Sequence, residues 1–215
     1  MDEESHKHEL VRREIIYWYN QHGRSFPWRT TTDPYHILIA EILLRRTTAS
    51  AVARIFGDFM KQFDTPERLA NARESTIVRA LSSLGLQSLR AKQLRKTASI
   101  IVNDYNGEIP RSSESLQSLP GVGVYIASAV KIFAYGEAAP LVDGNVIHFI
   151  SRVFGIQYIG PSDAKAWEFM TQFGGSHETK LYWGIIDLVA TVCLRQNPRC
   201  GTCPLSMICD YKKSI

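Results

Sequence analysis

The sequence predicts an all-α fold, built around one good-sized core or around two small lobes that share it. Apolar residues recur at spacings of three and four along most of the chain, and no stretch alternates polar and apolar residues between hairpin turns. The 215 residues are enough to bury a sizeable core. With 45% hydrophobic and 21% charged residues, the composition excludes a disordered, collagenous or coiled-coil chain.

The helices are predicted from this spacing in chain order. A first pattern runs from His36 to Phe59, and the β-branched pair Thr47 and Thr48 breaks it into two helices. Further helices are predicted at residues 67–71, 75–83, 90–104, 114–118, 124–134, 145–153, 163–173 and 180–192. The chain is therefore expected to hold about nine or ten short helices.

The N-terminus, MDEESHKHEL, is acidic and polar, with no apolar signal core after it. We expect it to be a mobile tail, and we assign no metal to His6 and His8 within it. No run approaches the roughly 20 apolar residues of a membrane span. The net charge of +4 favours polyanionic partners. We therefore expect a soluble, cytoplasmic protein without a membrane partner, associated with the nucleoid if the source is prokaryotic.

All four cysteines lie near the C-terminus, with six, two and five residues between successive members: Cys193, Cys200, Cys203 and Cys209. Such grouping is unsuited to a disulfide scaffold, but four thiolates this close in sequence can surround one metal centre. Zinc prefers paired C-x2-C knuckles, of which the chain has one. The unequal spacing favours a [4Fe–4S] cluster, with zinc or four unrelated buried cysteines as the alternatives.

The segment LPGVGVY at residues 119–125 lies between two predicted helices. Gly121 and Gly123 permit a hairpin whose backbone N–H groups, with that of Val124, point outward at a helix N-terminus and can bind a phosphate. This is the helix-hairpin-helix pattern, which would hold DNA through its backbone without reading its sequence. The alternative is an ordinary turn.

Asp143, in the segment LVDGNV, precedes a predicted apolar helix. A carboxylate at a helix start is favoured in its ionised form by the free N–H groups and the helix dipole. On its own this pattern is equally that of a simple N-cap.

Taken in order, the hairpin, the Asp143 helix and the four cysteines resemble the endonuclease III and MutY branch of the helix-hairpin-helix DNA glycosylases. The segments FPWR (26–29), DPY (33–35) and EILLRRT (41–47) resemble the MutY side, and LLRRTTA (43–49) resembles the archaeal thymine-DNA mismatch glycosylases. The resemblance implies a two-lobe all-α fold, a structural [4Fe–4S] cluster on a C-terminal loop, and hydrolysis of a base–sugar bond in duplex DNA. It divides the chain into a six-helix barrel-type domain at 28–134 and a cluster domain at 1–27 plus 135–215.

The resemblance also implies roles for three residues. Asp143 would stabilise the oxocarbenium-like transition state and orient the attacking water. Tyr125 stands where bifunctional lyases carry a lysine, so we expect a monofunctional hydrolase in which Tyr125 shapes the pocket. Glu41 lies in an apolar run, where burial would raise the pKa of its carboxyl. It would act as a general acid on adenine or contact a flipped pyrimidine. The alternatives are a packed aromatic for Tyr125, and a solvated face or a salt bridge for Glu41.

The sequence departs from the adenine glycosylases at three points that bear on which base is removed. The chain stops at residue 215, so we expect the domain that recognises 8-oxoguanine to be absent. Arg45 and Arg46 replace a Gln pair, and we expect them to face the duplex. One would enter the gap that the flipped base leaves, and the other would contact the estranged base. Trp183 replaces a Gln that helps to recognise adenine; it would stack on the flipped base or belong to the core. A further basic group would suit phosphate contacts: Arg90, Lys92, Arg95 and Lys96.

The sequence therefore predicts a monomeric DNA repair enzyme that removes a mismatched base, thymine or uracil opposite guanine, from double-stranded DNA. One alternative is an adenine glycosylase acting opposite guanine or 8-oxoguanine. Another is a non-catalytic lesion-binding or redox-sensing iron–sulfur protein, although such a protein would have no use for Asp143 and Glu41.

Overall fold

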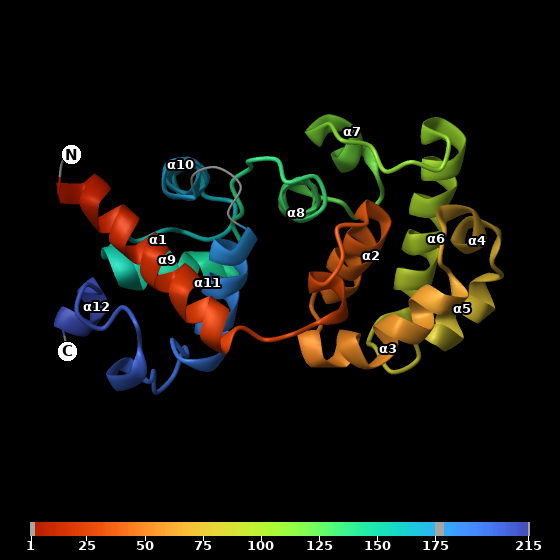
Figure 1. Ribbon diagram of the computed structural model, residues 1–215. Coiled ribbons are helices and arrows are strands. Elements are labelled where there is room, and N and C mark those ends of the chain that lie inside the picture. The colour runs from red at the N-terminus through yellow and green to blue at the C-terminus, as the bar shows by residue number, and fades with distance from the viewer. Residues whose placement is uncertain (1–2, 175–178, 215) are drawn as a thin grey trace. The chain divides into compact units, whose positions relative to one another are not determined.

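The protein is entirely helical in the residues that its computed structural model describes, 3–174 and 179–214 (Figure 1). These residues form twelve α-helices and two short 3₁₀ helices, and they contain no strand. The all-α prediction is confirmed, although the helices outnumber the nine or ten expected. The chain divides into two compact units, one of Met1–Arg24 with Glu137–Ile215 and one of Ser25–Gly136. The described residues include no helix with the length and apolar character needed to cross a membrane.

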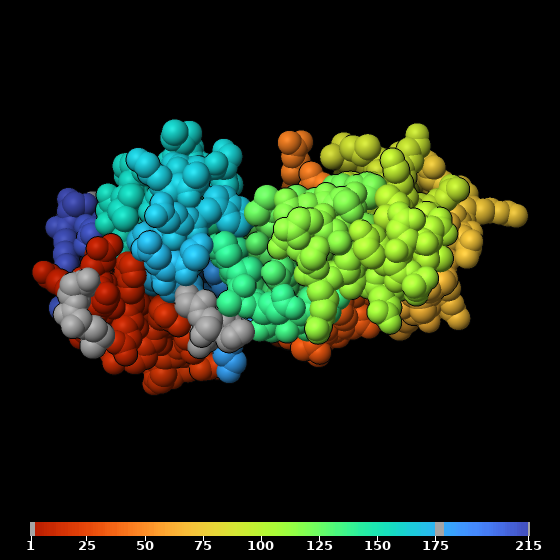
Figure 2. All heavy atoms as spheres, turned by 90° about the horizontal axis from the view of Figure 1, so that it is seen from above, coloured from red at the N-terminus to blue at the C-terminus, as the bar shows by residue number. Residues whose placement is uncertain are grey.

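The unit Ser25–Gly136 is organised around one largely apolar helix, α2 (Pro34–Leu44). The unit's other helices are α3 (Ala49–Gln62), α4 (Pro66–Asn71), α5 (Glu74–Ala80), α6 (Gln87–Tyr105), α7 (Ser113–Ser118) and α8 (Val124–Phe133). Helix α2 is buried along almost its whole length because α3, α6 and α8 pack around it. Helix α6 packs against α4 and α5, whereas α7 covers α8 and is mostly exposed, in green on the face seen in Figure 2.

Side-chain caps fix where several of these helices begin. Asp33, Thr48, Thr65 and Ser112 each accept a backbone N–H of the first turn, at 2.8 to 3.3 Å. The break predicted at Thr47 and Thr48 is therefore confirmed, since α2 ends at Leu44 and Thr48 caps α3. These caps use the Asp, Ser and Thr residues that a sequence marks as helix starts.

The other unit joins the two ends of the chain. Its helices are α1 (Glu3–His22), α9 (Gly144–Phe154), α10 (Ala164–Phe173), α11 (Thr179–Thr191) and α12 (Asp210–Lys213). Helix α11 packs against both α1 and α9, and α9 also contacts α12. The α1 and α11 backbones approach closely at Gly184, where a Cβ would lie 2.6 Å from the side chain of Ile15. A larger residue at position 184 would therefore push α1 away.

The expectation of a mobile N-terminal tail is wrong, because residues 3–22 form α1. The helix buries a narrow stripe, including Val11 and Ile15, in an otherwise polar segment, and so its helical spacing is weak. His8 is also part of this packing, with its ring 5.1 to 5.4 Å from the rings of Phe154, Phe169 and Phe173. The N-terminal segment is therefore an integral part of its unit.

Candidate functional site

The predicted helix-hairpin-helix is formed by α7, residues 119–123 and α8. Gly121 has a φ of +78°, a backbone conformation that favours glycine, and a Cβ there would also displace the side-chain amide of Gln93. Gly123 occupies the N-cap position of α8 and provides no side-chain acceptor. The first turn of α8, with Val124 half exposed, thus lacks the side-chain cap that α2, α3, α4 and α7 have.

Two side chains of the same unit hold the hairpin in place. Arg45 Nη1 donates to the carbonyl of Gly121 at 3.0 Å, and Thr97 Oγ1 donates to the carbonyl of Pro120 at 3.0 Å. Arg45 and Arg46 are both exposed, and Arg46 has the left-handed φ of +52°. Arg45 therefore connects the turn after α2 to the hairpin, and Arg46 follows it in a strained backbone conformation.

Arg90 is not an exposed phosphate ligand, contrary to the sequence-based expectation. It is 6% exposed, and its guanidinium donates five hydrogen bonds of 2.6 to 3.2 Å within its own unit. The acceptors are the carbonyls of Gly85, Ile42, Leu43 and Arg45 and the hydroxyl of Thr47. Arg90 thus satisfies the carbonyls at the end of α2 and shapes the turn that carries Arg45 and Arg46. Lys92, Arg95 and Lys96 are exposed on α6, as expected.

Two further predicted residues, Glu41 and Tyr125, lie in this unit. Glu41 is 6% exposed in the centre of α2, which contradicts the alternative of a solvated face. Tyr125 is the second residue of α8, next to the hairpin, and is partly exposed. The unit Ser25–Gly136 therefore contains the hairpin, both exposed arginines, the buried acid and the tyrosine.

Asp143 lies in the other unit, as the N-cap of α9. Its Oδ1 accepts the backbone N–H groups of Asn145 and Val146 at 2.8 Å each, and its Oδ2 accepts the side-chain amide of Asn145 at 3.0 Å. Burial raises the pKa of the Asp143 carboxyl above its ordinary value. The three hydrogen bonds and the charge of Arg195 act in the opposite direction without cancelling the rise. From the sequence, only the helix N–H groups and the helix dipole could be considered, and both favour an ionised Asp143. The burial that opposes them cannot be read from an N-cap pattern.

Trp183, on α11, belongs to the same unit as Asp143. It is partly exposed, and its ring lies 6.1 Å from that of Tyr19 on α1. Trp183 is therefore neither fully in the core nor fully on the surface.

The four predicted ligands, Cys193, Cys200, Cys203 and Cys209, border one cavity of about 20 Å³. Burial raises the pKa of the Cys193 thiol and raises that of Cys203 to about 11, and mutual repulsion between the thiolates acts in the same direction. Within residues 3–174 and 179–214, no three His, Cys, Asp or Glu side chains are arranged to hold a metal ion. The donor set nevertheless fits an iron–sulfur centre in kind, because four thiols of one loop face a common space.

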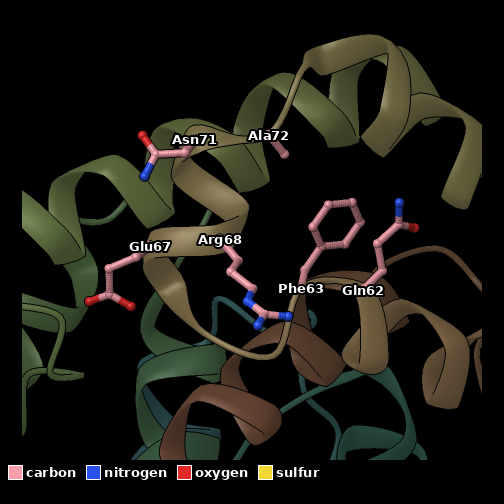
Figure 3. A pocket seen from close by; sticks show the side chains of 6 residues that line it. All are labelled: Gln62, Phe63, Glu67, Arg68, Asn71 and Ala72. Atoms are coloured by element: carbon pink, nitrogen blue, oxygen red, sulfur yellow. The ribbon is translucent and has the colours of Figure 1, made fainter.

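A pocket of about 420 Å³ also lies in the unit Ser25–Gly136, at the end of α3 and along α4. Figure 3 presents the side chains around it: Gln62, Phe63, Glu67, Arg68, Asn71 and Ala72. None of the predicted site residues lines this pocket, so the candidate site does not include it.

The sequence analysis did not single out Leu86 and Leu89, which are 57% and 63% exposed. Leu86 adopts a left-handed φ of +62° directly before α6. A large apolar side chain that is both exposed and strained is unusual. The only sequence signal would have been the Gly85 turn before it.

The all-helical fold, the glycine-dependent hairpin and the two carboxyl groups define a protein of the helix-hairpin-helix DNA repair class. The chain matches the model of the HhH-GPD superfamily base excision DNA repair protein over residues 39–172, and it belongs to this family. It is 39% identical over 210 residues to a thymine-DNA glycosylase of Aeropyrum pernix, which covers 94% of each chain. It is 36% identical over 213 residues to a thymine/uracil-DNA glycosylase of Methanothermobacter thermautotrophicus, covering 98% of this chain and 96% of that one.

A solved structure of a thermostable thymine-DNA glycosylase has the same fold, with a TM-score of 0.95, 34% identity and full coverage of both chains. The prediction of a helix-hairpin-helix DNA glycosylase, an enzyme that hydrolyses N-glycosyl bonds in base excision repair, is thereby confirmed.

Proposed function

We propose that this enzyme is a monofunctional glycosylase that removes thymine or uracil opposite guanine from duplex DNA, acting as a monomer. The full-length similarity to glycosylases named for thymine and uracil supports the choice of base. The observation that carries the chemistry is the Asp143 carboxylate, held by three hydrogen bonds at the start of α9.

The reaction requires that the target nucleotide leave the base stack, because the glycosidic bond cannot be reached within a duplex. As the bond breaks, positive charge develops on the sugar, and an ionised carboxylate held in place stabilises it. The hydrogen bonds to Asp143 fix the direction of its oxygens before the substrate arrives, so no reorganisation is needed during the reaction. Asp143 would also orient the water that attacks the sugar carbon.

Tyr125 supports the monofunctional assignment. A lyase step needs an amine that attacks the sugar and forms a Schiff base, and a phenol cannot provide one. The product is therefore an intact abasic site. Glu41, buried in α2, would contact the flipped pyrimidine.

DNA would be held by the hairpin and by the arginines beside it. The start of α8, where Gly123 provides no side-chain cap, suits a phosphate oxygen, and such a contact carries no sequence preference. Because Arg45 is hydrogen-bonded to the Gly121 carbonyl, we assign Arg46 to the estranged guanine, which an arginine can recognise through two hydrogen bonds.

We also propose that Cys193, Cys200, Cys203 and Cys209 hold a [4Fe–4S] cluster. Their position around one cavity supports it, as does their spacing in the sequence. When bound, such a cluster cross-links the loop and has a structural role. Iron and sulfide assays with absorbance at about 400 nm test this proposal. Stoichiometric zinc in their place would refute it.

The function is tested by single-turnover reactions on labelled duplexes containing T·G, U·G, A·G, A·8-oxoguanine or hypoxanthine pairs, each with and without alkali. We expect T·G and U·G to react fastest, with strand cleavage only after alkali. Strand nicking without alkali would refute the monofunctional assignment. A faster reaction of A·8-oxoguanine would favour the adenine alternative, and no reaction with any duplex would favour the non-catalytic one.

A further inference from the structure

Arg195 connects the loop of the four cysteines to the start of α9. It lies two residues after Cys193, and its Nη2 donates to the carbonyl of Gly144 at 2.9 Å. Gly144 directly follows Asp143 and is the first residue of α9. The arginine therefore binds the backbone of the turn that presents the Asp143 carboxyl.

The Arg195 side chain is exposed, but the fold holds the backbone at both ends of this contact. Helix α9 binds three consecutive carbonyls of the loop. His148 Nε2 donates to Cys193 O at 2.9 Å, while Arg152 donates to Leu194 O at 2.8 Å and to Arg195 O at 3.1 Å. His148 and Arg152 lie four residues apart and so share one face of α9. The backbone of Arg195 is thereby fixed where its side chain can reach back to Gly144.

The carbonyl that Arg195 binds is linked to Asp143 through a single peptide group. The Gly144 C=O and the Asn145 N–H belong to the same planar peptide, and that N–H donates to Asp143 Oδ1 at 2.8 Å. A cation bonded to the carbonyl holds the peptide plane and polarises it, so that the N–H becomes a stronger donor. The effect of Arg195 on the carboxylate is thus transmitted over one rigid group.

We propose that Arg195 is a positioning residue for Asp143: by binding the Gly144 carbonyl, it orients the peptide that holds the catalytic carboxylate. The proposal rests on the role assigned to Asp143 under the proposed function. The positive charge of Arg195 also lowers the pKa of Asp143, against the rise caused by burial. Arg195 therefore acts on this carboxyl through both orientation and charge.

The test compares Arg195→Gln with Arg195→Lys and with the control Arg199→Gln. Arg199 is an exposed arginine of the same loop, so its replacement removes the same charge without touching Gly144. We expect Arg195→Gln to lower the single-turnover rate at saturating enzyme about tenfold. The acid limb of its pH–rate profile should move to higher pH, because Asp143 loses a stabilising charge.

Arg195→Lys keeps the positive charge, so the acid limb should stay close to that of the wild type. It lacks the planar array of N–H donors of a guanidinium, so only part of the rate should be recovered. Arg199→Gln should leave the saturated rate and the acid limb unchanged. Rates are expressed per iron–sulfur centre, so that a loss of loop structure is not read as a loss of positioning.

Two outcomes would overturn the proposal. One is an Arg195→Gln enzyme that reaches the wild-type single-turnover rate once the enzyme concentration is saturating. That result would make Arg195 a DNA ligand only. The other is an unchanged pKa of the Asp143 carboxyl in a carbon-13 NMR titration, with the signal identified by its absence in Asp143→Asn. The titration needs no substrate, so it tests the effect of Arg195 on Asp143 independently of activity. A wild-type enzyme that cleaves no duplex would refute the proposed function but not this effect.

Discussion

Helices α8 and α9 begin in opposite ways. At α8 the N-cap is Gly123, which has no side chain to accept the N–H groups of the first turn. At α9 the N-cap is Asp143, whose own carboxylate accepts two of them. A helix start attracts negative charge in either case, but at α8 the anion must come from a ligand, whereas at α9 the chain supplies it. The same local physics thus suits one helix for binding phosphate and the other for holding a reactive carboxylate.

The largest effect is expected from neutralising the cap of α9. Asp143→Asn keeps an acceptor for the helix amides but removes the charge, so the single-turnover rate should fall by about 10³-fold while duplex binding persists. The matched control is Asp163→Asn, because Asp163 caps α10 through the N–H of Lys165 and accepts that of Ile159. If both variants lost activity equally, Asp143 would be no more than a cap.

The second prediction concerns pH. Burial raises the pKa of Asp143, so its carboxyl takes up a proton at a higher pH than a free Asp, whose pKa is about 3.9. The active form is ionised; the rate should therefore fall by about tenfold per pH unit below this raised pKa and be constant above it. Single-turnover rates across the acid range provide the measurement. An acid limb at or below the ordinary Asp value would contradict the prediction.

The third prediction converts the start of α8 into a copy of the start of α9. Gly123 has a φ of −94°, and a Cβ there would meet no described atom within 4 Å, so Gly123→Asp fits the fold. Its carboxylate should cap α8 and add a few tenths of a kcal/mol to the free energy of unfolding. It should also repel phosphate and weaken DNA binding about tenfold.

Gly123→Ala is the control for the third prediction, because it adds a Cβ without an acceptor. Fluorescence titration of both variants with duplex DNA measures the effect. Wild-type affinity in Gly123→Asp would mean that α8 does not receive a phosphate.

The smallest effect is expected from removing a hydrogen bond that holds the hairpin in place. Arg45→Gln removes the hydrogen bond to the Gly121 carbonyl, which should cost about 1 kcal/mol and weaken DNA binding several-fold. Hydrogen exchange at the Val122 amide, which donates to Leu119 O, should become faster because the hairpin opens more often. The control is Arg54→Gln, an exposed arginine on α3. Equal exchange rates in the two variants would show that Arg45 does not hold the hairpin.

Much of the fold could be predicted because its signals are local. The Thr48, Thr65 and Ser112 caps and the glycines of the hairpin are read directly from the sequence, as is the grouping of the cysteines. Helix α1 was missed because its contribution to the core is a narrow stripe that includes Val11 and Ile15. Helix α12 was missed because it is a single turn of four residues with none of them buried.

The site was predicted less completely, because burial and long-range contacts decide it. Arg90 has the same sequence pattern as its basic neighbours, but the α2 carbonyls and the Arg45 carbonyl that it binds lie more than 40 positions earlier. The hydrogen bond from Arg195 to the Gly144 carbonyl joins residues that are 51 positions apart in the sequence. The roles given to Asp143, Glu41, Tyr125, Trp183 and the cysteines stay predictions, and the Asp143→Asn variant tests the first of them.

The unit that contains Asp143 is made from both ends of the chain, since α1 packs on α11. During synthesis α1 emerges from the ribosome before α11, on which it packs. The residues 25–136 between them are complete much earlier and can fold as a unit. A nascent chain would thus complete its hairpin before the unit that holds Asp143, so its capacity to contact DNA would precede its capacity to react with it.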